Sequence, residues 1–176
     1  MNAMELFAYH FAAAGTQSAG GTVFVTTEQD EETVRNGVRS VGGRPDRIKV
    51  VVLKPGEEPP PLAKGARYVL DTFSAYAAEA GWDKAHARLV ALKAQARQAR
   101  TVLLVTVMDG LHEPREKTRL KLLGDGVLEL GFDRQGFGLY PFLKVTKMRG
   151  VPDSARFLLF KETEKGLFME STRRVF

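Results

Sequence analysis

Thr22-Val-Phe-Val-Thr-Thr-Glu28 is a β-branched and aromatic segment that turns polar at its end. This composition is typical of a buried strand. Acidic residues at 30–32 and valines at 34, 38 and 41 follow, and they predict a helix whose first turn carries the negative charge that the helix dipole favours. The aliphatic run at 48–53 predicts a strand covered on both faces. Strand, helix and strand in this order are typical of an α/β protein.

The same alternation continues on both sides of this unit. Residues 4–14, rich in alanine and aromatic side chains, predict a helix that ends at Gly15. Toward the C-terminus the predicted elements are strands at 67–70, 101–107 and 126–130 and helices at 82–100 and 113–123. After Gly131 the pattern changes to the strand-like runs 139–147, 156–161 and 166–170, which predict an antiparallel extension of the sheet.

Length and composition predict one folded domain over residues 1–176. Four prolines between residues 54 and 64 favour an extended surface loop inside that domain. The chain has no cysteine, which excludes disulfides and thiolate metal sites. No apolar run approaches the roughly 18 residues of a membrane span, so we expect a cytoplasmic protein. The formal net charge of +5 is compatible with attraction to nucleic acid or to an acidic partner.

One element that many nucleotide-binding α/β proteins use does not occur in residues 1–176. There is no G-x-x-x-x-G-K-[ST] segment, and the first lysine is Lys49. In that segment, consecutive backbone N–H groups and a lysine wrap the phosphates of the nucleotide. The sequence therefore predicts that this chain does not bind ATP tightly by itself.

Four segments follow one another in an informative order: Val23-Phe-Val-Thr-Thr-Glu28, Tyr68-Val-Leu-Asp-Thr-Phe-Ser74, Leu123-Gly-Asp-Gly-Val-Leu-Glu-Leu130 and Val145-Thr-Lys-Met-Arg-Gly150. Together they resemble the RecA superfamily, specifically its KaiC-like branch. The first is similar to the strand with the family's catalytic glutamate, the second to its Walker B strand, and the last to its V-x-KMRG segment. Residues 6–15 resemble the end of the helix that follows the phosphate loop, so the resemblance covers nearly the whole chain.

The resemblance implies a RecA-like, mainly parallel sheet with flanking helices and antiparallel C-terminal strands, from which the first (P-loop) strand is missing. In the RecA-type order that strand lies inside the sheet. Its loss would leave two rows of backbone donors and acceptors unpaired, and native proteins cover or pair such rows. We therefore expect either a rearranged sheet or a strand supplied by a partner.

Acidic residues close three of the predicted strands, at Glu28, Asp71 and Asp109. Open α/β sheets bind ligands at the carboxyl ends of their strands, so these residues are expected to converge. The resemblance implies that Asp71 holds a magnesium ion through water and that Glu28 polarises the attacking water. Because the phosphate loop is missing, we favour another interpretation. In it, the three acids are inherited polar residues at the ends of strands and have no catalytic role.

Lys147 and Arg149 alternate with Val145 and Met148 near the end of a predicted strand, which places both basic groups on one side while Met148 packs. The resemblance implies that this pair reaches across a subunit boundary toward the nucleotide of a neighbour, where an arginine fork suits phosphate oxygens. Surface charge on an edge strand is an equally good explanation.

Other basic residues cluster on two predicted helices: Lys84, Arg88, Arg97 and Arg100 on the first, and Arg115, Lys117, Arg119 and Lys121 on the second. They are compatible with contacts to a nucleic acid backbone, but glutamates interrupt them, which favours solvated helix faces. His112 is interpreted as loop polarity. Trp82 is interpreted as an anchor at the start of a helix.

These observations predict a non-catalytic regulatory or assembly subunit that acts through oligomerisation, either with copies of itself or with a related ATPase. Two alternatives stay open. One is an ATPase that binds ATP and magnesium with the help of another chain or of an unrecognised phosphate loop such as residues 15–21. The other is a nucleic-acid-binding accessory protein of the recombination type, suggested by the positive charge.

Overall fold

A computed structural model describes residues 3–62, 64–135, 138–151, 156–163 and 166–169. The chain divides into two compact units, Met1–His112 and Glu113–Phe176. We name them the parallel unit and the antiparallel unit after the sheets that they contain. The division into two units does not test the single domain predicted over residues 1–176, which stays a prediction.

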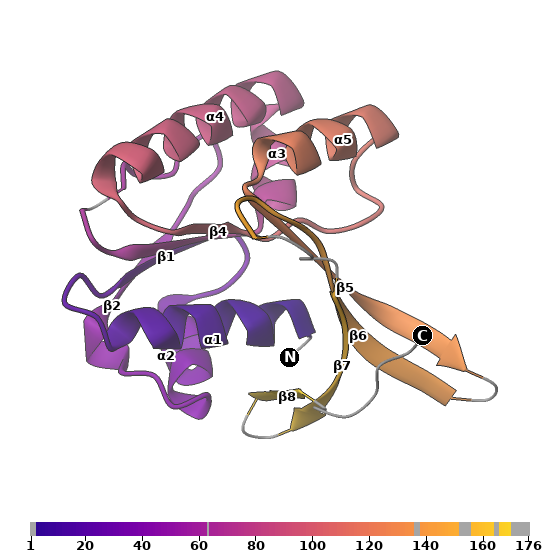
Figure 1. The fold of residues 1–176 in the computed structure, drawn as a ribbon. Coiled ribbons are helices and arrows are strands. Elements are labelled where there is room, and N and C mark those ends of the chain that lie inside the picture. Colours follow the sequence, from indigo (N-terminus) through magenta and orange to yellow (C-terminus); the bar gives the residue numbers. More distant parts are fainter. Residues whose placement is uncertain (1–2, 63, 136–137, 152–155, 164–165, 170–176) are drawn as a thin grey trace. The chain divides into compact units, whose positions relative to one another are not determined.

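The parallel unit contains a four-stranded sheet in the order β2-β1-β3-β4 (Figure 1). Its strands are β1 (Thr22–Thr26), β2 (Ile48–Val52), β3 (Arg67–Asp71) and β4 (Leu103–Val105). All three pairings are parallel. The α/β class and the parallel sheet predicted from the alternation of strands and helices are therefore confirmed.

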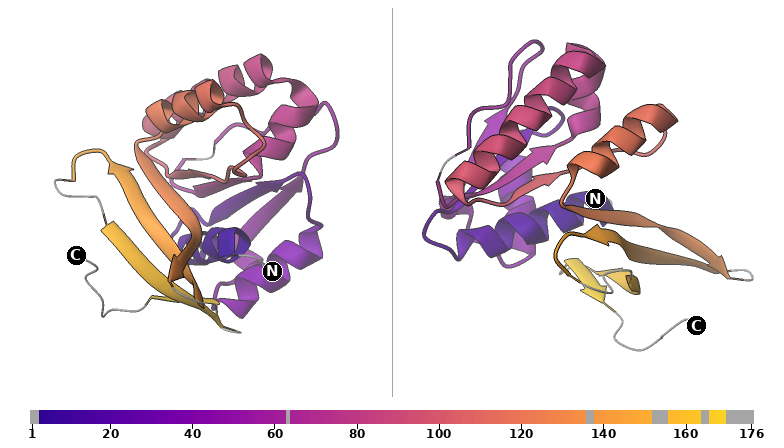
Figure 2. Two further views of the ribbon diagram at one scale, coloured as in Figure 1. Left: turned by 90° about the vertical axis from the view of Figure 1, so that its right-hand side faces the viewer. Right: turned by 45° about the horizontal axis from the view of Figure 1, so that its top comes forward.

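Helices cover both faces of this sheet. On one face lie α1 (Ala3–Thr16) and α2 (Glu31–Ser40), and on the other lie α3 (Phe73–Ala80) and α4 (Trp82–Ala99), as Figures 1 and 2 show. A short 3₁₀ helix, Pro45–Arg47, leads into β2. Coverage on both faces explains why the strands read as nearly continuous apolar runs.

A close contact between α1 and α2 fixes the core on the first face. Gly37 of α2 lies against the ring of Tyr9, and a Cβ atom placed on Gly37 would come within 2.3 Å of a ring carbon. The Tyr9 ring in turn packs on Phe24 of β1, with ring centroids 6.0 Å apart. Tyr9 and Phe24 are both buried. A glycine on α2 therefore sets how closely the two helices approach each other.

β3 and β4 are direct neighbours, with Tyr68, Val69 and Leu70 paired to Leu103, Leu104 and Val105. No strand lies between them in the described part of the parallel unit. The facing rows of backbone groups of β3 and β4 bond to each other, which is compatible with the expected rearranged sheet.

Helix α3 was not predicted from the sequence. Its start has a regular cap, since the Thr72 side chain accepts a hydrogen bond from the backbone N–H of Ala75. Four alanines and the following Gly81 are also helix signals. The eight-residue helix is short, and it leaves only Gly81 between itself and α4.

The proline-rich loop lies within the parallel unit, as predicted. Its carbonyl groups accept hydrogen bonds from two side chains: the hydroxyl of Tyr68 bonds to Pro60 at 2.9 Å, and the guanidinium of Arg88 bonds to Pro59. The side chain of Gln95 accepts a bond from the Leu62 N–H at 3.2 Å. The loop is therefore fastened to β3 and α4.

The antiparallel unit begins with α5 (Pro114–Leu123) and continues with β5 (Gly126–Gln135), β6 (Gly138–Met148), β7 (Arg156–Thr163) and β8 (Gly166–Met169). These strands form a sheet of their own in chain order. The predicted extension of the parallel sheet is thus wrong. The strand predicted at 126–130 is also longer and pairs antiparallel to β6. Within the described ranges, no helix is long and apolar enough to cross a membrane.

Candidate functional site

The carboxyl ends of β1, β3 and β4 meet at one edge of the parallel sheet. Thr26 is the register partner of Asp71, and Leu70 is the partner of Val105. Glu28 therefore follows the end of β1 by two residues, Asp71 ends β3, and Thr106 follows β4. This is the edge at which open α/β sheets bind ligands.

Asp71 is held by protein groups on both of its carboxylate oxygens. Its side chain is buried, with 1% of the residue exposed. One oxygen, Oδ1, accepts a hydrogen bond from the hydroxyl of Thr106 at 2.6 Å, and Oδ2 accepts one from the side-chain amide of Gln29 at 3.3 Å. Burial raises the pKa of Asp71, and the charges of Glu28 and Glu5 add to this rise, while the bond from Thr106 opposes it.

The hydrogen bonds continue from Gln29 to Tyr9. The Tyr9 hydroxyl donates to Oε1 of Gln29 at 2.5 Å. Burial raises the pKa of Tyr9 to about 12, helped by the negative charges of Glu5 and Asp71 and opposed by the bond to Gln29. The hydroxyl is therefore a donor at neutral pH, and this orients the Gln29 amide with its NH₂ group toward Asp71.

The three acidic residues expected to converge lie in different surroundings. Asp71 is buried, whereas Glu28 and Asp109 are exposed. Glu28 lies near enough to Asp71 to raise its pKa. The side chain that bonds Asp71 from the β1 end is nevertheless that of Gln29, and from the β4 end it is that of Thr106. These two neutral residues carry no specific signal in the sequence, because a glutamine or a threonine after a strand is common.

Both oxygens of Asp71 accept a bond from a protein donor, and each keeps a second lone pair. Magnesium takes octahedral oxygen ligands and keeps several waters, and an acid that holds the ion through water accepts hydrogen bonds from those waters. Among the residues that the structure describes, no group of three or more His, Asp or Glu side chains is arranged to hold a metal ion.

The glycine-rich residues 15–21 lie at the opposite edge of the sheet, because they follow α1 and precede β1. A phosphate loop instead leaves the carboxyl end of a strand and enters the N-terminus of a helix. Two carbonyl groups of this turn, those of Ser18 and Ala19, accept bonds from the guanidinium of Arg47. The N–H of Ser18 bonds within the turn, to the carbonyl of Gly15. This geometry does not support residues 15–21 as a phosphate loop.

Lys147 closes the C-terminus of α5. Its ammonium group donates to the carbonyl oxygens of Lys121, Leu122 and Gly124 at 3.1, 3.2 and 2.7 Å. The last carbonyls of a helix lack partners within the helix, and a positive charge there is favoured by the helix dipole. The ammonium is therefore used within the antiparallel unit.

Arg149 follows the end of β6 and forms an ion pair with Asp125 at 3.0 Å. Its backbone N–H also bonds to the carbonyl of Asp125 at 2.8 Å. The guanidinium is 55% exposed, and exposed pairs of this kind contribute about 0–1 kcal/mol. Met148, expected to pack, is 37% exposed. The side chain of Arg149 can therefore leave its partner more easily than that of Lys147, because Lys147 is held by three hydrogen bonds and Arg149 by a weak surface ion pair.

Replacement of Lys147 by methionine is expected to lower the free energy of unfolding by about 1 kcal/mol, because three carbonyl groups lose a charged donor. Urea denaturation followed by circular dichroism measures this change. Lys144→Met is the matched control, since Lys144 is an exposed residue of the same strand. Equal stability of the two variants would contradict the capping role.

His112 is buried, so its interpretation as loop polarity is wrong. Its Nε2 atom lies 2.9 Å from the hydroxyl of Ser74, which also accepts a bond from the N–H of Met108. The imidazole stacks on Phe73, with ring centroids 6.0 Å apart, and meets the ring of Trp82 at 5.6 Å. These contacts hold residues 106–112 against α3. Trp82 is the first residue of α4, as the sequence predicted.

The basic helix residues are partly neutralised. On α4, Lys84 and Arg88 both approach Glu58 of the proline-rich loop, at 4.0 and 3.7 Å. On α5, Lys121 pairs with Glu129 at 2.6 Å. The two helices belong to different units. These contacts support the interpretation of their charges as solvated helix faces.

No family model matches the chain, and no curated protein matches it. Among solved structures, a KaiC-like protein from the hyperthermophilic archaeon Pyrococcus horikoshii is similar, with a TM-score of 0.71 at 18% sequence identity. The match covers 96% of this chain and 84% of that protein. At this identity the likeness shows the fold alone, and it confirms the predicted RecA-like fold class.

Proposed function

We propose that this chain is a non-catalytic protein of the RecA-like fold that serves as a regulatory or assembly subunit, associating with copies of itself or with a related ATPase. The observation that carries the proposal is the state of Asp71. At the position that the resemblance gives to the magnesium-binding acid stands a buried carboxyl group whose two oxygens are bonded to Thr106 and Gln29.

Two further observations support a non-catalytic role. Residues 15–21 lie at the amino edge of the sheet, away from the carboxyl edge at which open α/β sheets bind ligands. Lys147 caps a helix of its own unit, which leaves Arg149 as the member of the basic pair that can exchange its weak surface partner for a group on a neighbouring subunit.

Calorimetric titration with ATP and magnesium tests the first half of the proposal. We expect no saturable heat up to millimolar nucleotide. Submicromolar binding, together with ATP hydrolysis that Asp71→Asn abolishes and Asp83→Asn leaves intact, would overturn it. Asp83 is a suitable control because it is an exposed acid on α4 of the same unit.

Sedimentation velocity over a wide range of protein concentration tests the second half. Self-association is expected, and Arg149→Gln is expected to weaken it if the arginine reaches a neighbouring subunit. A monomer at every concentration that also leaves the hydrolysis rate of a related ATPase unchanged would contradict the assembly role.

A further inference from the structure

The sheet of the antiparallel unit has one face rich in aromatic rings. Residues that are partners across antiparallel strands share a face. The register pairs Lys144 with Phe157, Phe142 with Leu159, and Lys161 with Phe168. Because side chains alternate along a strand, Tyr140 lies on the same face. We name this surface the aromatic face, made of Tyr140, Phe142, Lys144, Phe157, Lys161 and Phe168.

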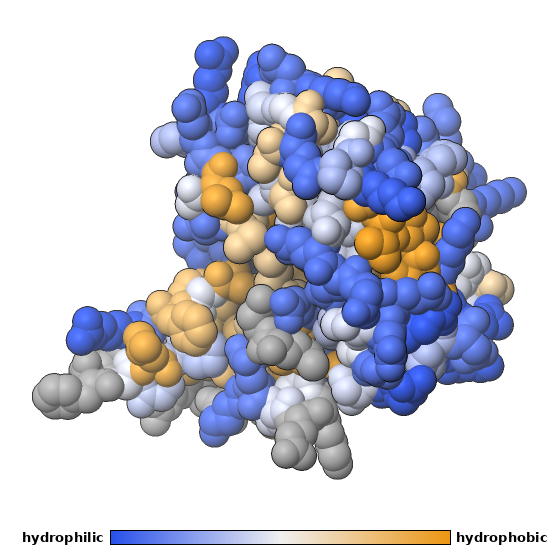
Figure 3. Space-filling view, turned by 180° about the vertical axis from the view of Figure 1, so that it is seen from behind, coloured by the Kyte–Doolittle hydropathy of each residue, from blue (hydrophilic) through white to orange (hydrophobic). Residues whose placement is uncertain are grey.

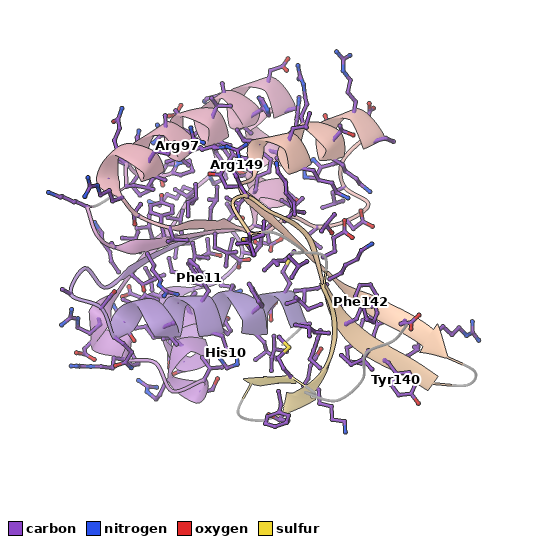
Figure 4. All side chains as sticks on the ribbon, in the orientation of Figure 1. His10, Phe11, Arg97, Tyr140, Phe142 and Arg149 are labelled. Carbon is purple, nitrogen blue, oxygen red and sulfur yellow. The ribbon has the colours of Figure 1, made fainter. Side chains whose placement is uncertain are left out.

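Its rings are open to solvent. Tyr140 is 45% exposed, Phe157 38% and Phe168 66%, and the ring of Phe142 stacks on that of Phe157 with centroids 4.7 Å apart. The buried apolar side chains of the sheet, those of Leu143 and Phe160, belong to the other face. Figure 4 labels Tyr140 and Phe142 on β6, and the space-filling view in Figure 3 colours the residues of the molecule by hydropathy. The core of the sheet is thus on one side and the stacked rings are on the other.

Positive charge accompanies these rings. Lys144 lies beside Phe157 and Lys161 beside Phe168, and both lysines are exposed. Residues 113–176 carry 13 basic and 9 acidic side chains, so +4 of the chain's net charge of +5 belongs to the antiparallel unit. Among the residues that the structure describes, the acids on this face are Glu129 and Asp133 of β5, which lie opposite Lys144 and Tyr140, and Glu129 is bound to Lys121.

We propose that the aromatic face binds single-stranded nucleic acid across β6, β7 and β8. Bases stack on Tyr140, Phe157 and Phe168, and the ammonium groups of Lys144 and Lys161 contact backbone phosphates. Flat aromatic rings interleaved with cations match this ligand, because every base has a face for stacking and every nucleotide carries a negative charge.

Fluorescence anisotropy of a labelled oligothymidylate at low salt tests the proposal, with an oligouridylate to compare DNA with RNA and a duplex as competitor. Phe168→Ala and Tyr140→Ala are each expected to weaken binding about tenfold, which corresponds to the loss of one stacked base. Phe132→Ala is the matched control. Phe132 is 64% exposed but lies on the opposite face, opposite Pro141, and its loss should leave binding unchanged.

A second pair of variants examines the charges without touching an aromatic ring. Lys144→Gln is expected to weaken binding and to lower the salt dependence by about one counterion. Arg134→Gln, at an exposed position on the opposite face, is expected to change neither. Unfolding curves of all variants confirm that they fold.

Three results would overturn the proposal. The first is the absence of binding at low salt. The second is an equal loss in Phe132→Ala, or duplex binding as tight as single-strand binding with the aromatic variants unaffected, which indicates attraction to charge alone. The third is a change in self-association in Phe168→Ala without oligonucleotide binding, which makes the face a protein interface. None of these outcomes depends on whether the chain binds ATP.

Discussion

Asp71→Asn is expected to raise the free energy of unfolding at neutral pH, although the same exchange at a magnesium-binding acid would destroy catalysis. Asparagine has nearly the shape of aspartate and no charge to desolvate. Its oxygen still accepts the bond from Thr106. Its NH₂ group faces Gln29, whose amide turns over so that Tyr9 becomes the acceptor instead of the donor.

The pH dependence of this effect follows from the raised pKa of Asp71. For an acid, the pKa in the unfolded chain is about 4. If the pKa is higher in the native protein, the acid stabilises the fold at pH values below 4. This contribution is lost as the pH rises through the native pKa. The stability advantage of Asp71→Asn over the parent should therefore grow from pH 4 upward and level off once Asp71 has ionised. Urea denaturation of both proteins across this range measures the difference, in which the titration of all other groups cancels.

Asp83→Asn serves as the control for this series, since it removes a charge from an exposed position of the same unit. Its stability difference from the parent should stay small. If Asp71→Asn were less stable than the parent at pH 8, the ionised carboxylate would be the favoured form. Such a result is what a site built around a cation requires, and it would count against the proposed function.

Gly37→Ala is expected to lower the free energy of unfolding by about 2 kcal/mol. The new methyl group would come within 2.3 Å of the Tyr9 ring, and overpacking of a close-packed core costs about 1–3 kcal/mol and occasionally more. The gain in helix propensity, about 1 kcal/mol, offsets part of this cost. The ring cannot turn aside freely, because it packs on Phe24 and its hydroxyl bonds to Gln29.

Thermal and urea denaturation measure this loss. Asn36→Ala, the exposed neighbour in the same helix, should be neutral or slightly stabilising. In a Tyr9→Ala background, Gly37→Ala should cost much less, since the atoms that it meets are gone. Additive losses in the double variant would show that the two residues do not meet.

The parallel unit was largely predictable because its strands are covered on both faces. A run such as Ile48–Val52 reads as a strand wherever it lies. Helix α3 escaped because its eight residues show no full apolar stripe before Gly81 interrupts them. The separate second sheet escaped for another reason. The alternation of apolar and polar residues predicts that β5 to β8 are strands. It does not predict whether they pair with the edge of the parallel sheet or only with each other.

The candidate site was predicted only in part. A strand-end acid marks Asp71, but the groups that decide its chemistry, Gln29, Thr106 and Tyr9, come from three other elements. Their role depends on tertiary proximity. The capping role of Lys147 could not be predicted for the same reason. It depends on where α5 lies, and the sequence of β6 alone does not show this.

The direct pairing of β3 with β4 limits how another polypeptide can join this sheet. Tyr68 through Leu70 and Leu103 through Val105 already satisfy each other, so an intruding strand would first have to unzip them. In the described part of the sheet, β2 and β4 are the outer strands, and β4 offers three residues to a newcomer. A partner that augments this sheet therefore gains few backbone bonds, and tight association must come from side chains elsewhere on the surface.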